Sequence, residues 1–529
     1  MLYLFVVVPI FLSVMLYLFS SKSFVRVASI IAQFILFIAA IHLFAVSTPD
    51  YYIYMAVGGF DSILGIILRA DKLSATFVLL TTFLFLIASL YSFKESSSRL
   101  FWFLMFIWQG TLLGVFLTGD FFNIFVLMEV STVAVAIMIM YNRSNRSLYD
   151  GMIYLMINTI IIQFYLVGIG FIYRITGGLD LVHVQTALTG LERESLVLPY
   201  ALLMTFVALK CALIPLYGWL PKAHGTPGAL SAVSALLSGL HIKSGVYLFL
   251  RFHEVFEPIA APEIFLVVGF ITALVGVVMS VAQTDIKLIL AYSTVAQIGL
   301  IIVGFTISYR YSYNYIGSLY HIMNHAIFKS ALFLSAGVIT YAYGTRDITQ
   351  IRGVLKTMPI LAVAKILAIM GIIGTPLFNG SISKYFLMSG VDWQLNTLMI
   401  IINLGTITIF MKYCTIFFGN PLSEVHVKTD LWRHIPILIL GVLCFTGGIF
   451  GAQAISLLFG FNVILDTRGY IEKSIIFLAS LVAGFLIFKY FVQNNALLDK
   501  VKEIDMGFRG MCLSMGLFLA VILVTVGFA

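Results

Sequence analysis

The chain has little charge. Asp, Glu, Lys and Arg make up 10% of its 529 residues, whereas hydrophobic residues make up 61%. So few charges cannot cover the surface of a water-soluble domain, which excludes a soluble globular protein. The net charge of +8 does not require a nucleic-acid partner, because basic loops beside anionic lipid account for it. The composition predicts a membrane protein in contact with a lipid bilayer.

Cysteine is also scarce. The chain has four cysteines, which are scattered and form no C-x-x-C pair: Cys211, Cys414, Cys444 and Cys512. This spacing excludes an iron–sulfur cluster held by this chain. The sequence also lacks a G-x-G-x-x-G after a strand and a G-K-[ST] phosphate loop, so no dinucleotide or ATP site is predicted. We expect no cofactor and no catalytic site, so an ion gradient or a partner subunit must supply the energy for any transport.

Long apolar runs fill the chain. A run of about 20 residues crosses a bilayer as a helix, and such runs recur with short polar breaks. The approximate spans are 3–19, 26–46, 73–93, 101–119, 121–141, 152–173, 197–220, 229–250, 263–283, 287–308, 315–342, 359–391 with a break, 396–418, 435–460, 473–492 and 508–528. The first run lacks a cleavage site and is interpreted as a retained helix. We predict an all-α polytopic membrane protein with about 14 to 16 transmembrane helices.

The loops predict an orientation. Loops after odd-numbered runs hold about twice as many Lys and Arg as loops after even-numbered runs. The positive-inside rule therefore places the odd-numbered loops in the cytoplasm and both termini outside.

Five charged residues lie near the middle of apolar runs: Glu129, Lys210, Lys243, Lys329 and Lys384. A charge at the centre of a membrane helix costs about 2.5 to 3.5 kcal/mol unless it is paired or hydrated. Structural ion pairs are one explanation, and long lysine side chains that reach the headgroups are another. The mid-span positions favour a functional site instead.

Two of these runs contain helix breakers. Pro215 and Pro221 follow Lys210, and Pro376 precedes Lys384. Proline removes a backbone donor and interrupts a helix. Interrupted helices at matching places in two halves are typical of inverted-repeat transporters with ion sites near the midplane.

A row of protonatable groups lies on one helical face. His321, His325 and Lys329 follow one another at intervals of four residues. Histidines at this spacing can bind a metal, but no carboxylate nearby offers a third ligand, so we predict no metal. They can also simply form hydrogen bonds within the bundle. The row favours a proton relay, since such groups titrate near neutrality.

Four stretches resemble a known family of membrane subunits. They are Phe122–Glu129, Gly218–Lys243, Leu290–Gly299 and His321–Leu334. Together they resemble the antiporter-like subunits shared by respiratory complex I, Mrp-type sodium/proton antiporters and the membrane-bound hydrogenase and sulfur-reductase complexes. The resemblance covers about residues 100 to 390. The loop 225–228 is more glycine-rich than is usual in the family.

The resemblance implies a core of about fourteen helices, with two inverted five-helix repeats, two broken helices and a mid-membrane file of charged residues and water. It divides the chain into N-terminal helices at 1–100, a first half at 101–252, a second half at 253–420 and C-terminal helices at 421–529. In the first half, Glu129 resembles the glutamate of the fifth helix, and Lys210 its lysine partner on the broken seventh. Lys243 matches the lysine or histidine of the eighth.

In the second half, His325 and Lys329 resemble the central connecting residues, and Lys384 resembles the terminal lysine of the broken twelfth helix. The implied function is proton translocation along Glu, Lys, His and water, within a complex that contains other membrane subunits. The resemblance leaves open whether Na⁺ moves and whether iron–sulfur or hydrogenase-type subunits take part. We expect a prokaryotic plasma membrane. The alternative is a self-contained secondary transporter of a cation or small solute.

Some charged residues are expected to have no role in transport. Lys365, Lys412 and Lys489 lie toward the ends of their runs, where they can reach the headgroups. The segment 499–505 is predicted to be a solvated loop. The two helices after residue 470 exceed the core that the resemblance implies.

Overall fold

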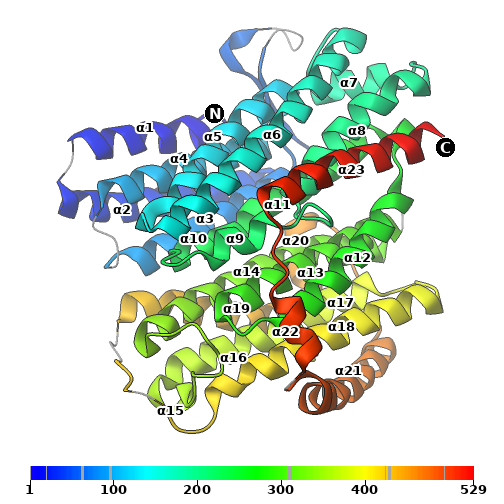
Figure 1. The fold of residues 1–529 in the computed structure, drawn as a ribbon. Helices are drawn as coiled ribbons and strands as arrows, with labels where there is room; N and C mark the ends of the chain where they lie inside the picture. The colour runs from blue at the N-terminus through cyan, green and yellow to red at the C-terminus, as the bar shows by residue number, and fades with distance from the viewer. Residues whose placement is uncertain are drawn as a thin grey trace.

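Most of the chain is helical. A computed structural model describes residues 2–19, 21–49, 51–60, 65–94, 98–307, 312–422, 424–426, 430–493 and 495–528. Figure 1 shows helices lying side by side in one bundle, with α1 to α11 in its upper part and α14 to α19 in its lower part.

The first part of the chain contains α1 (Leu4–Phe19), α2 (Lys22–Val46), β1 (Ile53–Ala56), η1 (Val57–Gly59), β2 (Ile67–Ala70), α3 (Lys72–Ser92), α4 (Arg99–Leu117), α5 (Phe121–Ile139), η2 (Met140–Asn142), α6 (Asn145–Thr176), α7 (Leu181–Leu188), α8 (Arg193–Lys210), α9 (Trp219–Gly225), α10 (Ser231–Leu236), the π-helix η3 (Leu237–His241) and α11 (Ile242–Val255).

The second part contains η4 (Glu257–Ile259), α12 (Pro262–Ala282), α13 (Ile286–Ile307), α14 (Tyr313–Tyr343), α15 (Val354–Thr357), α16 (Pro359–Ile373), α17 (Asn379–Leu387), α18 (Trp393–Cys414), η5 (Thr415–Phe417) and α19 (Leu431–Ile449). The last part contains α20 (Gly451–Phe459), α21 (Thr467–Ile487), the π-helix η6 (Phe488–Val492), α22 (Ala496–Lys502) and α23 (Phe508–Gly527).

The expected fold class is confirmed. Within the described residues, 13 helices are long and apolar enough to cross a membrane, and the shorter α1 and α16 are apolar as well. The predicted run 435–460 is divided into α19 and α20 at Phe450. Gly451 packs against Ile382 there, and a Cβ would stand 2.7 Å from the Ile382 side chain. The inverted five-helix repeats stay a prediction.

One element was not expected from the sequence. Strands β1 and β2 pair in antiparallel register, with Ile53 opposite Ala70. The Ile67 carbonyl oxygen accepts a hydrogen bond of 2.8 Å from the Gly119 amide, which joins the hairpin to the start of α5.

Asp71 anchors this end of the bundle. Its carboxylate caps α3 through the Ser74 amide and accepts hydrogen bonds of 2.7 Å at both oxygens from the Arg251 guanidinium on α11. Burial by itself raises the pKa of Asp71, but the Arg251 charge and the hydrogen bonds outweigh it and lower the pKa from 3.8 to about 2. The ion pair therefore stabilises the fold above pH 3.8, and this contribution is lost as the pH falls toward 2.

The Asp71→Ala variant should lower the thermal unfolding temperature in detergent at pH 7, because it removes about 2 kcal/mol of linkage energy and leaves Arg251 with only the 3.7 Å ion pair to Glu254. Glu472→Ala is the matched control, since the Arg468–Glu472 pair has side chains that are 89% and 63% exposed. If Asp71→Ala unfolds at the wild-type temperature, Asp71 does not anchor this end of the bundle.

The two helices at the C-terminus pack on this chain's own bundle. Helix α21 lies against α18, and α23 lies against α8. Figure 1 shows α22 crossing the bundle between them. We call residues 495–507, which contain α22 and join η6 to α23, the strap. It passes over the start of α9, where a Cβ on Gly218 would stand 3.1 Å from the Met506 side chain.

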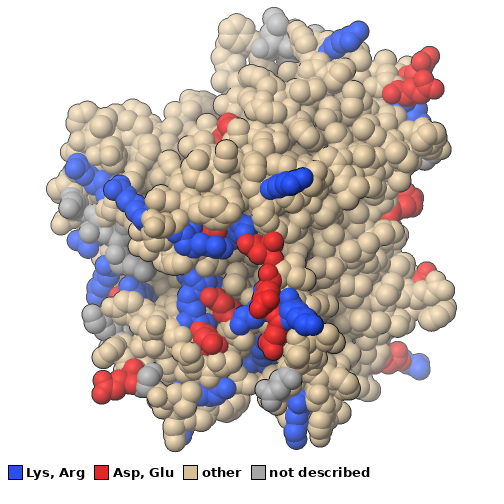
Figure 2. Space-filling view, in the orientation of Figure 1, with Lys and Arg blue, Asp and Glu red and all other residues tan. Residues whose placement is uncertain are grey.

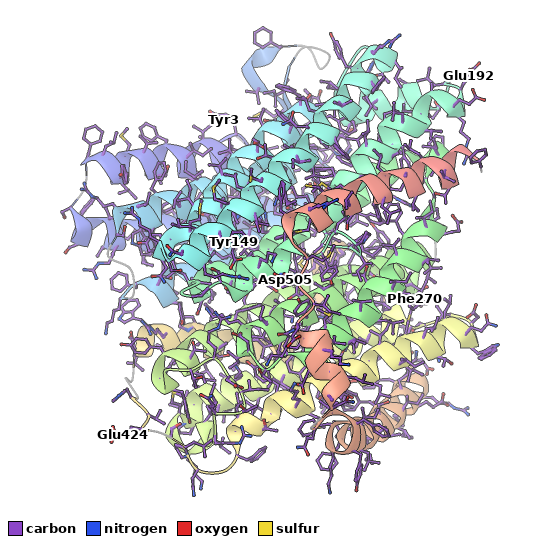
Figure 3. All side chains as sticks on the ribbon, in the orientation of Figure 1. Tyr3, Tyr149, Glu192, Phe270, Glu424 and Asp505 are labelled. Atoms are coloured by element: carbon purple, nitrogen blue, oxygen red, sulfur yellow. The ribbon has the colours of Figure 1, made fainter. Side chains whose placement is uncertain are left out.

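The segment 499–505 is mostly exposed, as predicted, but it is not a loop throughout. Residues 499–502 belong to α22, and Asp505 forms an ion pair with Lys222, whose Nζ donates to both carboxylate oxygens at 2.5 and 2.6 Å. Figure 3 labels Asp505 at this place, and Figure 2 shows acidic and basic side chains gathered where the strap crosses. Lys222 is nearly buried, and this carboxylate compensates its charge.

The Asp505→Asn variant should loosen the strap, because it leaves the buried Lys222 ammonium without its counter-charge, at a cost of about 1 to 2 kcal/mol. Limited proteolysis should cleave the strap several-fold faster than in the wild type. Asp499→Asn changes an exposed carboxylate of the same strap and should cleave at the wild-type rate. Equal cleavage of both variants would show that the ion pair does not hold the strap.

Candidate ion-translocation site

The first interruption follows directly after Lys210. Helix α8 ends at that residue, Ala212 adopts a left-handed φ of 51°, and the Ile214–Pro215 peptide bond is cis. Pro215 thus lies inside the interruption. Pro221 lies in the first turn of α9, where the missing amide hydrogen is not needed. The indole nitrogen of Trp219 donates a 2.8 Å hydrogen bond to the Leu209 carbonyl oxygen and satisfies an acceptor at the end of α8.

Lys210 is buried among neutral acceptors. Its ammonium donates to Asn158 Oδ1 at 2.6 Å and to Thr132 Oγ1 at 3.1 Å. Glu129 lies one turn before Thr132 on α5, but within the described residues it forms no ion pair with Lys210, and its Oε2 is buried without a partner. Gly245 lets α11 pack onto this place, because a Cβ there would stand 2.7 Å from the Lys210 carbonyl carbon.

His241 was missed by the sequence reasoning and lies between the lysines of the first half. Trp108 Nε1 points to its Nδ1 at 3.3 Å, and Tyr154 OH lies 2.9 Å from its Nε2. An indole nitrogen is only a donor, so Nδ1 accepts, and the proton of a neutral ring is on Nε2. Tyr154 and Asn158 both lie on α6, one turn apart, so His241 and Lys210 contact neighbouring turns of the same helix.

A π-helix places the next lysine. The segment Leu237–His241 is a π-helix between α10 and α11, a feature that is frequent at functional sites. Lys243 follows it and is fully buried. Its ammonium contacts the Ser238 carbonyl oxygen and lies 2.5 Å from His325 Nδ1 on α14. This contact joins the two halves of the chain.

His325, His321 and Lys329 all face the interior from α14 and are fully buried. The Nε2 of His325 has no hydrogen-bond partner among the described residues. Lys329 donates to the Leu290 carbonyl oxygen at 2.9 Å and contacts Ser293 Oγ, both on α13. The rings of His321 and His325 have centroids 6.5 Å apart.

His321 contacts the helix that follows the second interruption. Its Nε2 lies 2.9 Å from Gln297 Oε1, and its Nδ1 lies 2.9 Å from Ser383 Oγ, the neighbour of Lys384. Gln297 in turn donates to Thr406 Oγ1 at 3.1 Å. Neutral polar side chains such as Gln297 and Asn158 were also missed, although an isolated amide inside an apolar run was a readable signal.

The second interruption separates α16 from α17. Gly374 ends α16 with a left-handed φ of 83°, and the break 374–378 contains Pro376. Lys384 on α17 reaches back across it and donates to the Ile372 carbonyl oxygen at 2.7 Å. It also donates to Asn403 Oδ1 on α18 at 2.7 Å.

The expectation that Lys365 reaches the headgroups is wrong, because this residue is fully buried. Its ammonium donates to Ser335 Oγ at 3.1 Å and lies 4.9 Å from the centre of the Tyr413 ring. Lys412 caps the end of α12, with 2.7 Å hydrogen bonds to the Val281 and Gln283 carbonyl oxygens. Lys489 is exposed.

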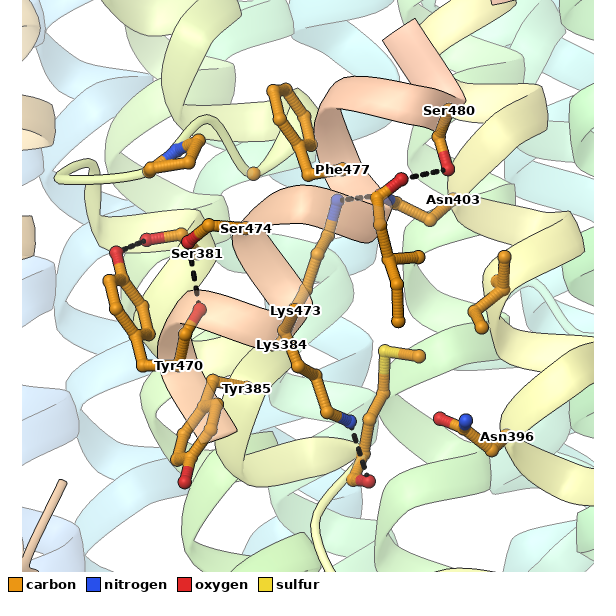
Figure 4. A pocket seen from close by; sticks show the side chains of 15 residues that line it. Ser381, Lys384, Tyr385, Asn396, Asn403, Tyr470, Lys473, Ser474, Phe477 and Ser480 are labelled. Atoms are coloured by element: carbon orange, nitrogen blue, oxygen red, sulfur yellow. Dashed lines mark hydrogen bonds between the residues drawn. The ribbon is translucent and has the colours of Figure 1, made fainter. Parts of the chain in front are cut away.

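Lys384 also lines a pocket between α17, α18 and α21, which Figure 4 shows from close by. The pocket has a volume of about 60 Å³. One water needs about 10 to 15 Å³, so several waters fit. Among the described residues no three His, Cys, Asp or Glu side chains gather in a way that could hold a metal ion.

The interior thus carries a file of titratable and neutral polar groups from one broken helix to the other. We call this the polar file and define it by its titratable members: Lys210, His241, Lys243, His325, Lys329, His321 and Lys384. Two broken helices joined by such a file define a class of membrane proteins that move ions through the middle of a helical bundle.

Comparison with known proteins agrees with this class. Residues 118–411 match the family described as NADH:quinone oxidoreductase/Mrp antiporter, transmembrane, and the chain belongs to this family. It is 30% identical over 417 residues to an Na⁺/H⁺ antiporter subunit of Alkalihalophilus pseudofirmus, covering 77% of this chain and 84% of that protein. It is 29% identical over 432 residues to an NADH-quinone oxidoreductase subunit of Desulforudis audaxviator, covering 76% and 85%.

The fold has solved counterparts as well. A chain of the Mrp complex from Dietzia sp. DQ12-45-1b superposes with a TM-score of 0.80 at 23% identity, covering 91% of this chain and 99% of that one. The family resemblance expected from the four sequence stretches is therefore confirmed.

Proposed function

We propose that this chain is the proton-translocating, antiporter-like subunit of a multisubunit membrane complex, either an Mrp-type cation/proton antiporter or a hydrogenase-like or respiratory assembly. The observation that carries the proposal is the polar file, a series of buried polar groups that extends from one broken helix to the other. The relatives named as subunits of an antiporter and of a quinone oxidoreductase support it.

The exposed side of α5 supports neighbouring membrane subunits. Glu129 is only half-buried, and the flanking Val126 and Val130 are 40% and 41% exposed. A carboxylate beside lipid is costly. A neighbouring membrane subunit that covers this side of α5 would remove that cost. The bacterial sources of the relatives favour a prokaryotic plasma membrane.

The switch of the mechanism is the pair of Glu129 and Lys210. A buried lysine keeps its proton beside a carboxylate and loses it more readily without one. In the present arrangement Lys210 forms no ion pair with Glu129 and donates to neutral Thr132 and Asn158, which is the arrangement in which it would release its proton. Tyr154 and His241 offer the next positions, and Lys243, His325, Lys329 and His321 lead on to Lys384.

The alternative of a self-contained solute transporter requires a substrate pocket at an unwound helix. The first interruption is filled, since Cys211, Ala212 and Leu213 are fully buried. The pocket at the second interruption has room for only a few waters. Both observations favour proton transfer.

The Lys210→Met variant should abolish proton translocation by the complex in membrane vesicles while the complex still assembles, because methionine keeps the volume but cannot carry a proton. Glu129→Gln should slow translocation at least tenfold, since the amide cannot hold the lysine charge. Lys489→Met, an exposed lysine outside the file, is the control. Proton flux at the wild-type rate in Lys210→Met would refute the proposed mechanism.

The same vesicles test whether sodium moves. With an imposed pH gradient and radioactive sodium, a coupled antiport predicts that Lys210→Met stops both fluxes. Sodium flux that continues without proton flux would assign sodium to a neighbouring chain of the complex.

A further inference from the structure

Helix α21 lies outside the part of the chain that matches the family, yet it forms one wall of the pocket around Lys384. The residues it supplies are Tyr470, Lys473, Ser474, Ile476, Phe477 and Ser480. Figure 4 shows Lys384 and Lys473 in the same pocket, with Asn396 and Asn403 on the facing helix α18.

The pocket is built at two levels along the helices. At the inner level, Lys384 donates to Asn403 Oδ1. At the outer level, Lys473 donates at 2.9 Å to the carbonyl oxygen of Met388, one turn beyond Lys384. Asn396 lies seven residues before Asn403 and therefore on the same face of α18. Each level thus contains one lysine and one asparagine.

The outer level has an unused acceptor. Asn396 Oδ1 is buried and has no hydrogen-bond partner among the described residues. Buried polar atoms are nearly always bonded to protein or to water, and the pocket volume of about 60 Å³ accommodates several waters. Water between Asn396 and the two lysines would satisfy this acceptor.

Tyr470 ties α21 to the helix interruption. Its hydroxyl accepts a 3.0 Å hydrogen bond from the Leu377 amide, and it lies 2.8 Å from Ser381 Oγ. Leu377 belongs to the break between α16 and α17, and its φ of 70° is left-handed. The wall made by α21 is therefore fixed to the same backbone that positions Lys384.

We propose that α21 completes a water-filled vestibule through which Lys384 exchanges protons with one side of the membrane, the side of loop 388–392, and that Lys473 is the outer proton-exchanging group of this vestibule. The proposal rests on the proposed function, because Lys384 is taken as the last lysine of the polar file. A proton leaves the Lys384 ammonium to water, passes to the neutral Lys473 amine and leaves it again to bulk water, so no oxidant or other reactant is needed.

The vestibule itself can be tested without measuring transport. The test uses a complex in which the four cysteines of this chain are replaced by alanine. In that background, Asn396→Cys should react with a membrane-impermeant maleimide from the side of loop 388–392 only. Leu398→Cys is the matched control, because Leu398 lies two residues away on α18 and is 37% exposed on the bundle surface, away from the pocket. The vestibule would be overturned if neither cysteine variant reacts with the maleimide, or if Asn396→Cys reacts from the opposite side of the membrane.

Lys473 is tested by two substitutions. Lys473→Met and Lys473→Arg should both slow proton translocation several-fold, because arginine stays protonated at all accessible pH values and cannot pass a proton on. A lysine needed only for its hydrogen bond to Met388 would be replaced by arginine without loss. Wild-type flux in Lys473→Arg would therefore overturn the role of Lys473.

Lys384→Met separates this proposal from the proposed function. If Lys384→Met abolishes the flux and the Lys473 variants do not change it, the function stands and Lys473 has no part in it. If Lys384→Met transports as the wild type does, the proposed function fails as well, whatever the maleimide reaction shows.

Discussion

A lysine inside a helical bundle needs oxygen atoms around its ammonium, since neither lipid nor apolar side chains can replace water. The regular helix offers few, because its carbonyl oxygens already accept hydrogen bonds from its own amides. Where a helix is interrupted, carbonyl oxygens become free to accept hydrogen bonds from a lysine. Lys384 uses the Ile372 carbonyl beside a break, and Lys412 uses the Val281 and Gln283 carbonyls at a helix end.

Several of the buried lysines therefore lie beside irregular backbone, whereas Lys329 and Lys365 bond to groups of regular helices. Lys243 contacts the Ser238 carbonyl oxygen within a π-helix, and Lys210 is the last residue of α8 before the first break. Where no backbone carbonyl oxygen is near, a neutral side chain accepts the hydrogen bond from the ammonium, as Asn158 does for Lys210. Within the described residues, none of these ammonium groups forms an ion pair with a carboxylate, and their hydrogen bonds go to neutral acceptors.

The C-terminal helices extend the core that the family match covers. Helix α23 packs on α8 of the first half and α21 packs on α18 of the second, so the strap between them bridges both halves. The Lys222–Asp505 ion pair fixes the strap beside the first broken helix, and Tyr470 fixes α21 beside the second. The extra helices thus contact the chain at both interruptions.

The sequence by itself determined the class of the protein. Its scarce charge and repeated apolar runs required a polytopic helical bundle, and its four motif stretches indicated the family, because these signals are local in the chain. The five mid-span charges were readable for the same reason, whereas the places of His241, Asn158 and Gln297 depend on partners from other helices. Only the tertiary structure decided which groups meet. Contacts such as Lys243 with His325, Lys365 with Ser335 and Lys222 with Asp505 join segments between 30 and 283 residues apart, and such distances are closed by packing between helices, which local sequence patterns do not encode.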